Sequence, residues 1–147
     1  MMAFRLARPG HLVDINNIAA LANLDFDGGH LNIGACVRHA RLERGVPEMG
    51  RLGDLLATVA RHIGHRPIRT RGTFCGSLAN ADPASEWCLV ATTLEAQLTL
   101  ASSGGQRTLA ATEFLEGAMF TAIAEDELLT GARLPALPGD TLSLIHI

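Results

Sequence analysis

The sequence contains no tyrosine and only one tryptophan, so it has no aromatic platform for stacking nucleic-acid bases. Its three cysteines, Cys36, Cys75 and Cys88, are an odd number and show no CxxC spacing. This pattern argues against a disulfide framework and against a structural zinc site. Reduced thiols in a cytoplasmic protein fit the cysteine usage best.

Charge of one sign is not concentrated in any long run, and the net charge is −3. This balance argues against a dedicated nucleic-acid-binding protein, which would carry a basic face. No apolar stretch approaches the roughly 18 residues of a membrane span. The first ten residues lack the apolar region of a signal peptide. Hydrophobic residues make up 48% of the 147 residues, which is enough to build the core of one domain.

The periodicity of apolar residues predicts a mixture of strands and helices. Residues 24–33 and 96–111 each favour a hairpin, because apolar residues alternate on both sides of Asp-Gly-Gly and Ser-Gly-Gly turns. Residues 51–65 favour a helix, since apolar residues recur there at spacings of three and four. Four further elements are expected: a short helix over 37–45, a strand over 127–135, a weak strand over 11–15, and a strand or extended chain over 68–74. The predicted fold class is α+β.

The stretch RGTFCGSLANADPASE, residues 71–86, has few bulky side chains and reads as a loop. A helix is expected to begin at Pro83, with Asp82 as its cap. Glycines allow close approach of a ligand, and amides near a helix start favour an anion such as a pyrophosphate. The polar candidates for such contacts are Thr73, Ser77, Asn80, Asp82 and Glu86. Tight packing between a helix and a strand explains the same composition equally well, and the spacing matches neither G-x-G-x-x-G nor the P-loop.

The same stretch resembles the second flavin-binding motif of the medium subunit of molybdenum hydroxylases. This family includes the carbon monoxide dehydrogenase medium subunit and the flavin domain of xanthine dehydrogenase. Its pattern is roughly R-[GH]-T-[IV]-G-G-[SN]-[LIV]-A-H-A-D-P-A-[AS]-[DE]. The flanking segments RLARPGHLVDIN, LNIGACVRHARLE and GGQRTLAATEFLEGAMFTAIAEDELLTGARLP also resemble family segments, so the resemblance covers nearly the whole chain up to about Pro135.

The resemblance implies an α+β FAD-binding domain of the vanillyl-alcohol-oxidase type (PCMH type), with FAD as the cofactor. It implies that flavin receives electrons from [2Fe-2S] clusters of a small partner subunit and passes them to an acceptor. Substrate oxidation then belongs to a large subunit that carries the molybdenum cofactor. The chain itself is expected to hold no catalytic or metal-binding residue. The implied cofactor-binding residues are Thr73, Phe74, Cys75, Gly76, Ser77, Asn80, Asp82, Glu86, Ile63 and Leu129.

The sequence departs from the family pattern in two ways. Cys75 replaces the first glycine of a pair, so we expect a negative φ there, and Asn80 stands where the family often has histidine. The family's first phosphate loop, A-G-G-x-S-L, and its C-terminal domain have no counterpart in this sequence. We therefore expect residues 1–135 to form an incomplete FAD-binding domain and residues 136–147 to be a linker or a non-native tail.

Several alternatives remain open. The chain could be a truncated, non-catalytic fragment that holds no cofactor and only contacts partner subunits. Cys75 could be the nucleophile of a thiol hydrolase, which would need a nearby histidine. His62 and His65 could bind a metal, although Gly64 interrupts the helix between them. An arginine cluster precedes the motif and forms either a solvated edge, the preferred interpretation, or a face toward an anionic cofactor or a partner subunit: Arg61, Arg66, Arg69 and Arg71.

Overall fold

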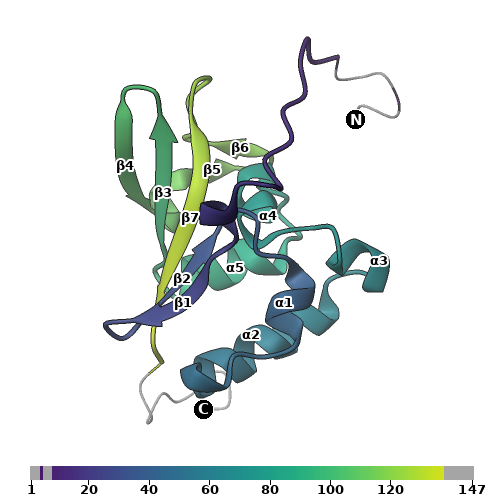
Figure 1. Ribbon diagram of the computed structural model, residues 1–147, viewed down its shortest axis with the longest axis vertical. Coiled ribbons are helices and arrows are strands. Elements are labelled where there is room, and N and C mark those ends of the chain that lie inside the picture. Colours follow the sequence, from purple (N-terminus) through teal and green to yellow (C-terminus); the bar gives the residue numbers. More distant parts are fainter. Residues whose placement is uncertain (1–3, 5–7, 138–147) are drawn as a thin grey trace.

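The computed structural model describes residue 4 and residues 8–137 and shows helices packed against a five-stranded antiparallel sheet (Figure 1). The strand order is β1-β2-β7-β3-β4. The strands of this sheet are β1 (Leu24–Asp27), β2 (His30–Gly34), β3 (Gln97–Ser102), β4 (Gly105–Ala110) and β7 (Leu128–Pro135). A separate two-stranded sheet pairs β5 (Leu115–Gly117) with β6 (Phe120–Thr121). This mixture of helices and strands confirms the predicted α+β class.

Six α-helices lie between or beside these strands in the described part of the chain. They are α1 (His39–Glu43), α2 (Arg51–His62), α3 (Arg66–Arg69), α4 (Phe74–Asn80), α5 (Glu86–Thr93) and α6 (Ala111–Phe114). Single turns of 3-10 helix cover Ala19–Ala22 and Pro47–Met49. None of the helices in residues 8–137 combines the length and the apolar character that crossing a membrane would require.

Both predicted hairpins are confirmed, and their turns follow from glycine chemistry. In the β1–β2 hairpin, Asp27 pairs with His30 across Gly28 and Gly29, which have φ values of 55° and 77°. Glycine adopts this left-handed region without the steric cost of a Cβ. The β3–β4 hairpin closes with Ser102 opposite Gly105. β7 then lies between the two hairpins and pairs with both β2 and β3.

The core lies between the sheet and the helices that cover one of its faces (Figure 1). From the sheet, alternate residues of β2 and β3 point into it, as expected for strands with one buried face. In β7 the alternation shifts by one residue opposite Thr99 and Leu100, where the register is irregular. These buried strand residues are Leu31, Ile33, Leu98, Leu100, Leu129, Ala132 and Leu134. From the helices, the largest fully buried side chains are Leu42, Leu52, Leu56, Phe74, Leu78, Trp87 and Phe114. The apolar stripe predicted on α2 is thus confirmed by the burial of Leu52, Leu56 and Ala60.

The segment between α2 and α5 differs from the prediction. Residues 68–74 were expected to be a strand or extended chain, but they include the end of α3, where Pro67 provides a φ suited to a first helical turn. The stretch expected to be a loop contains α4. The next helix begins at Glu86 rather than Pro83, because the Asp82 carboxylate accepts from the Ala84 amide at 2.9 Å and stabilises a turn instead of a helix start.

Two further expectations concern the ends of the chain. Residues 11–15 were expected to be a weak strand, but they form no strand in the structure. The expected linker or tail over residues 136–147 falls almost entirely outside the described residues, so that expectation stays a prediction.

Candidate functional site

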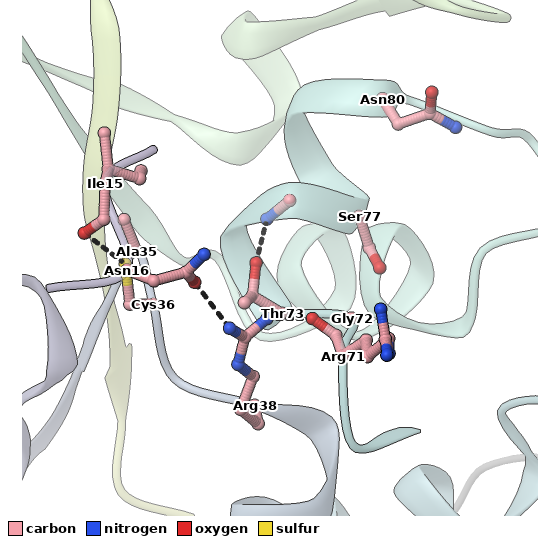
Figure 2. A pocket seen from close by; sticks show the side chains of 11 residues that line it. Ile15, Asn16, Ala35, Cys36, Arg38, Arg71, Gly72, Thr73, Ser77 and Asn80 are labelled. Carbon is pink, nitrogen blue, oxygen red and sulfur yellow. Dashed lines mark hydrogen bonds between the residues drawn. The ribbon is translucent and has the colours of Figure 1, made fainter. Parts of the chain in front are cut away.

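Residues 71–80 form one wall of a hollow of about 430 Å³ (Figure 2). The facing wall comes from the N-terminal segment around Ile15 and from the chain between β2 and α1. The polar side chains that line it are Asn16, Arg38, Arg71, Thr73, Ser77 and Asn80. Segments far apart in the sequence therefore meet around the predicted motif.

The motif residues reach the hollow because they form one face of α4. Thr73, Gly76, Ser77 and Asn80 all line it, and their spacing of three, four and seven residues is that of neighbours along a helix. The opposite face of α4 carries Phe74, Cys75 and Leu78, which are buried in the core. This spacing is present in the sequence, but small polar residues do not produce a hydrophobic period, so the sequence pattern alone predicts a loop here.

The Thr73 side chain fixes the start of α4. Its Oγ1 accepts a hydrogen bond from the Gly76 amide at 3.0 Å, which is the usual role of a threonine before a first helical turn. A Cβ on Gly76 would lie 2.6 Å from that same oxygen. Glycine at position 76 is therefore needed for close packing against the cap. Because Oγ1 only accepts in this bond, the hydroxyl proton of Thr73 is left to donate to a ligand.

Most backbone amides of this segment already have acceptors within the protein. The Phe74 amide donates to the Val37 carbonyl at 3.1 Å, and the Ser77 amide donates to the Thr73 carbonyl at 3.1 Å. Within residues 8–137, only the amides of Thr73 and Cys75 among positions 73–77 lack a protein acceptor. Side chains, more than the backbone, thus provide the donors of this hollow.

Arg38 joins the two walls of the hollow. Its guanidinium donates to the Arg71 carbonyl and to the Asn16 side chain, as Figure 2 shows for Asn16. The backbone continues this connection, since the His39 amide donates to the Gly72 carbonyl at 3.1 Å. The lining includes two guanidinium groups, from Arg38 and Arg71, and no carboxylate. The hollow therefore favours an anionic group.

A second hollow, of about 220 Å³, adjoins the first at Ser77 and Asn80. Its lining carries the carboxylates of Asp82 and Glu86. Carboxylates accept hydrogen bonds from hydroxyl groups. The two hollows together, here called the groove, suit a molecule with an anionic part at Arg38 and Arg71 and hydroxyl groups at Asp82 and Glu86.

Comparison with known proteins agrees with this chemistry. Residues 1–137 match the family described as the FAD binding domain in molybdopterin dehydrogenase. The chain belongs to this family. It is 36% identical over 138 residues to the nicotine 6-hydroxylase medium subunit of Paenarthrobacter nicotinovorans, covering 94% of this chain and 48% of that protein. It is 38% identical over 137 residues to the caffeine dehydrogenase subunit beta of Pseudomonas sp. (strain CBB1), covering 92% and 46%.

Solved structures place the same fold in relatives of this FAD-binding domain. Quinoline 2-oxidoreductase from Pseudomonas putida 86 superposes with a TM-score of 0.87 at 37% identity, over 93% of this chain and 47% of that one. Carbon monoxide dehydrogenase from Hydrogenophaga pseudoflava superposes with a TM-score of 0.89 at 34% identity, over 95% and 48%. The chain thus spans about half the length of the relatives that it matches.

The groove fits the cofactor of the family. FAD carries a diphosphate, which matches the two guanidinium groups and the free Thr73 hydroxyl of the first hollow. It also carries ribose and ribityl hydroxyls, which match the acceptors of the second hollow. Cys75 lies inside α4, so its φ is negative as predicted, and a thiol is tolerated where the family has glycine.

The structure brings six of the ten predicted cofactor-binding residues to the groove and leaves four away from it. Those that line it are Thr73, Gly76, Ser77, Asn80, Asp82 and Glu86. The side chains of Phe74 and Cys75 are buried in the core, so these two residues can contribute only their backbone. Leu129 is 3% exposed in β7, and Ile63 lies at the end of α2, where its carbonyl accepts from Arg69 at 3.2 Å. Neither lines the groove.

Arg38 and Asn16 were missed by the sequence prediction. Both fall in segments that resemble the family, but nothing in their local pattern marks them as ligands. Arg38 reaches the groove because the chain after β2 pairs with the motif through an isolated bridge between Arg38 and Thr73. Asn16 comes from the segment before β1 and is held there by the hydrogen bond that its side chain accepts from Arg38. Only these tertiary contacts reveal that both residues line the groove.

The thiol-hydrolase alternative is wrong. Cys75 is 2% exposed, and its thiol faces the Ile33 carbonyl at 3.7 Å. Burial, and to a lesser degree the neighbouring Cys36, raises the pKa of the Cys75 thiol to about 12. A thiol that is neutral and enclosed at neutral pH is not a nucleophile. The metal alternative gains no support either, since His62 and His65 find no third ligand among the described residues.

Proposed function

We propose that this chain is the FAD-binding part of a medium subunit in a molybdenum-containing hydroxylase or dehydrogenase, and that it relays electrons through flavin. The observation that carries the proposal is the groove: one helical face of small and polar residues opposite Arg38, in a chain that belongs to the FAD-binding family. FAD supplies the redox chemistry, because its ring system accepts and releases electrons. The protein contributes placement and charge.

Each residue of the groove has a distinct part in holding the cofactor. Arg38 and Arg71 offset the charge of the diphosphate, and the hydroxyls of Thr73 and Ser77 donate to its oxygens. Further along, Asn80, Asp82 and Glu86 hold hydroxyl groups. Phe74 and Cys75 support this surface from the core. The proposal does not use Ile63 or Leu129, which lie away from the groove.

The names of the relatives motivate the partners that we propose. They are called medium subunits, medium chains or lettered subunits of hydroxylases and dehydrogenases. By this analogy the present chain works beside a large subunit with the molybdenum cofactor and a small subunit with [2Fe-2S] clusters. Electrons pass from the clusters to the flavin and then to an acceptor. Selection of the substrate then belongs to the large subunit.

FAD titration of the full-length subunit tests the proposal. Arg71→Gln removes one charge at the diphosphate without breaking a hydrogen bond or ion pair from that side chain to residues 8–137. It should weaken FAD binding about tenfold, the worth of one charge-assisted contact. Arg41→Gln is the matched control, because Arg41 lies on α1 and donates to the Gly45 carbonyl away from the groove. Equal affinities for Arg71→Gln and Arg41→Gln would contradict the assignment of the groove.

The alternative of a fragment without cofactor makes a different prediction. In that case the 147-residue chain is colourless after purification, takes up no FAD, and still associates with the iron–sulfur partner. Flavin absorption of the purified chain, measured beside a pull-down with the partner, separates the two readings.

A further inference from the structure

A third hollow, of about 370 Å³, lies where α1, α2 and α3 meet, away from the flavin groove. Figure 1 shows these three helices together beside the sheet. The charged and polar residues that line the hollow are Glu43, Arg44, Arg61, Arg66, Arg69 and Thr70. The lining thus contains four arginines and one glutamate. This arginine hollow includes three of the four arginines that the sequence grouped before the motif.

Among these four arginines, only Arg69 forms an ion pair or side-chain hydrogen bonds within residues 8–137. Its Nε lies 3.0 Å from Glu43 Oε2, and its Nη1 donates to the carbonyls of Ile63 and Gly64 at 3.2 and 2.8 Å. The Arg69 side chain is 14% exposed and acts as a structural tie between α1, α2 and α3. Glu43 carries the one carboxylate in the lining of the hollow, and it is already paired with Arg69.

The other three arginines have no counter-charge in the described residues. No hydrogen bond or ion pair joins the side chains of Arg44, Arg61 or Arg66 to any part of residues 8–137. Arg44 and Arg61 stand at the C-terminal ends of α1 and α2, where a cation is favoured locally. That local preference does not explain why Arg44, Arg61 and Arg66 all line the same hollow. Cations gathered in this way repel one another until an anion joins them.

We infer that the arginine hollow binds a small molecule with at least two negative charges on phosphate groups. Guanidinium groups match phosphate oxygens in pairs, and all twelve basic residues of the chain are arginine rather than lysine. A single carboxylate of a partner would leave most of the charge unmatched, whereas a diphosphate matches it. The volume also lies within the usual range for small-molecule sites. The arginine hollow shares no lining residue with the flavin groove, so the two sites can be tested independently.

Titration with inorganic pyrophosphate tests the inference on the full-length subunit loaded with FAD, so that the groove is already filled. Calorimetry should show one site in the unmodified subunit. The double variant with Arg61→Gln and Arg66→Gln should bind about tenfold more weakly or worse, since two charge-assisted contacts are lost. Arg41→Gln again serves as the control for the loss of one arginine charge, because Arg41 lies on α1 and does not line the hollow. Unchanged FAD content confirms that the variants fold.

Three outcomes would overturn the inference. Pyrophosphate could fail to bind the unmodified subunit at low-millimolar concentration. Arg41→Gln could weaken binding as much as the double variant does, which would show only general surface charge. Pyrophosphate could fail to bind while the double variant separates from its partner subunits, which would show that the hollow accepts carboxylates of another protein. None of these outcomes affects FAD titration, so the proposed function stands or falls separately.

Discussion

The stability of this protein should depend on pH through one buried histidine. His39 is 3% exposed, and its Nδ1 accepts a hydrogen bond from Trp87 Nε1 at 2.9 Å. An accepting Nδ1 requires the neutral ring. On the other side of the ring, a Cβ on Gly72 would lie 2.5 Å from Nε2, so the ring packs directly against the Gly72 backbone. Burial, and then the charge of Arg38, lowers the pKa of His39 from 6.5 to about 4.

The sign and the size of the effect follow from this pKa. The unfolded chain binds a proton at His39 near pH 6.5, whereas the folded chain binds it only near pH 4. The neutral His39 ring therefore contributes its full stabilisation above the unfolded-state pKa of 6.5, and this stabilisation is lost as the pH falls toward the folded-state pKa of about 4. A difference of this size corresponds to about 3 kcal/mol in the free energy of unfolding. Below the folded value the contribution of His39 no longer changes.

Urea denaturation across this pH range measures the effect. Trp87 is the only tryptophan of the chain, so its emission reports both unfolding and the loss of its bond to His39. His39→Asn keeps an acceptor near the position of Nδ1 but removes the titrating ring. Between pH 6.5 and pH 4 its free energy of unfolding should therefore fall by about 3 kcal/mol less than that of the unmodified chain. His62→Asn, at an exposed histidine of α2, should follow the unmodified chain. Parallel pH profiles for the chain and His39→Asn would refute the reasoning.

Three further predictions test the cap, the core thiol and a surface ion pair. Thr73→Val should lower the free energy of unfolding by about 1 kcal/mol in thermal denaturation, and Gly76→Ala should lower it by a similar amount because its Cβ displaces the same hydroxyl. Thr73→Ser keeps the hydroxyl and should lower it little. Equal stabilities of Thr73→Val and Thr73→Ser would contradict the capping role. Cys75 should resist alkylation at mildly alkaline pH in the folded chain and react in urea, as mass spectrometry of the modified peptide would show. Glu127→Gln should speed hydrogen exchange of the Ala124 amide, which donates to that carboxylate at 2.8 Å. The hydrogen bonds that Glu127 accepts from Arg107, and then from the Ala124 amide, lower the pKa of Glu127 to about 2. In the unmodified chain, the hydrogen bond from the Ala124 amide to Glu127 should therefore persist until the pH falls toward that value.

The elements predicted well were those whose signal is local. The hairpin at Gly28 and Gly29 was predicted because glycine marks a tight turn and the flanking residues alternate. Helix α2 was predicted because its buried face repeats leucine at the helical spacing. In both cases the side chains that reveal the element are also the ones that stabilise it in the core.

The prediction of a loop over residues 71–86 was wrong because the residues that start and end α4 are not apolar. Helix α4 begins through a hydroxyl on Thr73 and ends at Ala81, which has a φ of 47°. Neither feature produces a hydrophobic period. Three of the residues on its buried side, Phe74, Cys75 and Leu78, are too few to stand out against the small residues between them. The position of Arg38 in the groove depends on tertiary pairing and could not be inferred from any window of sequence.

The two interpretations of the motif, close packing and cofactor binding, apply to different residues of it. The glycines are explained by packing alone, since a Cβ on Gly72 would meet His39 at 2.5 Å and one on Gly76 would meet Thr73 at 2.6 Å. The polar residues are not explained in this way, because Ser77 and Asn80 face the open groove and contribute little to the core. Glycine in such a motif is therefore evidence for how the helix is seated, and the polar face of α4 is the evidence for a ligand. Substituting Ser77 should reduce FAD affinity at constant stability, whereas substituting Gly72 should reduce stability first.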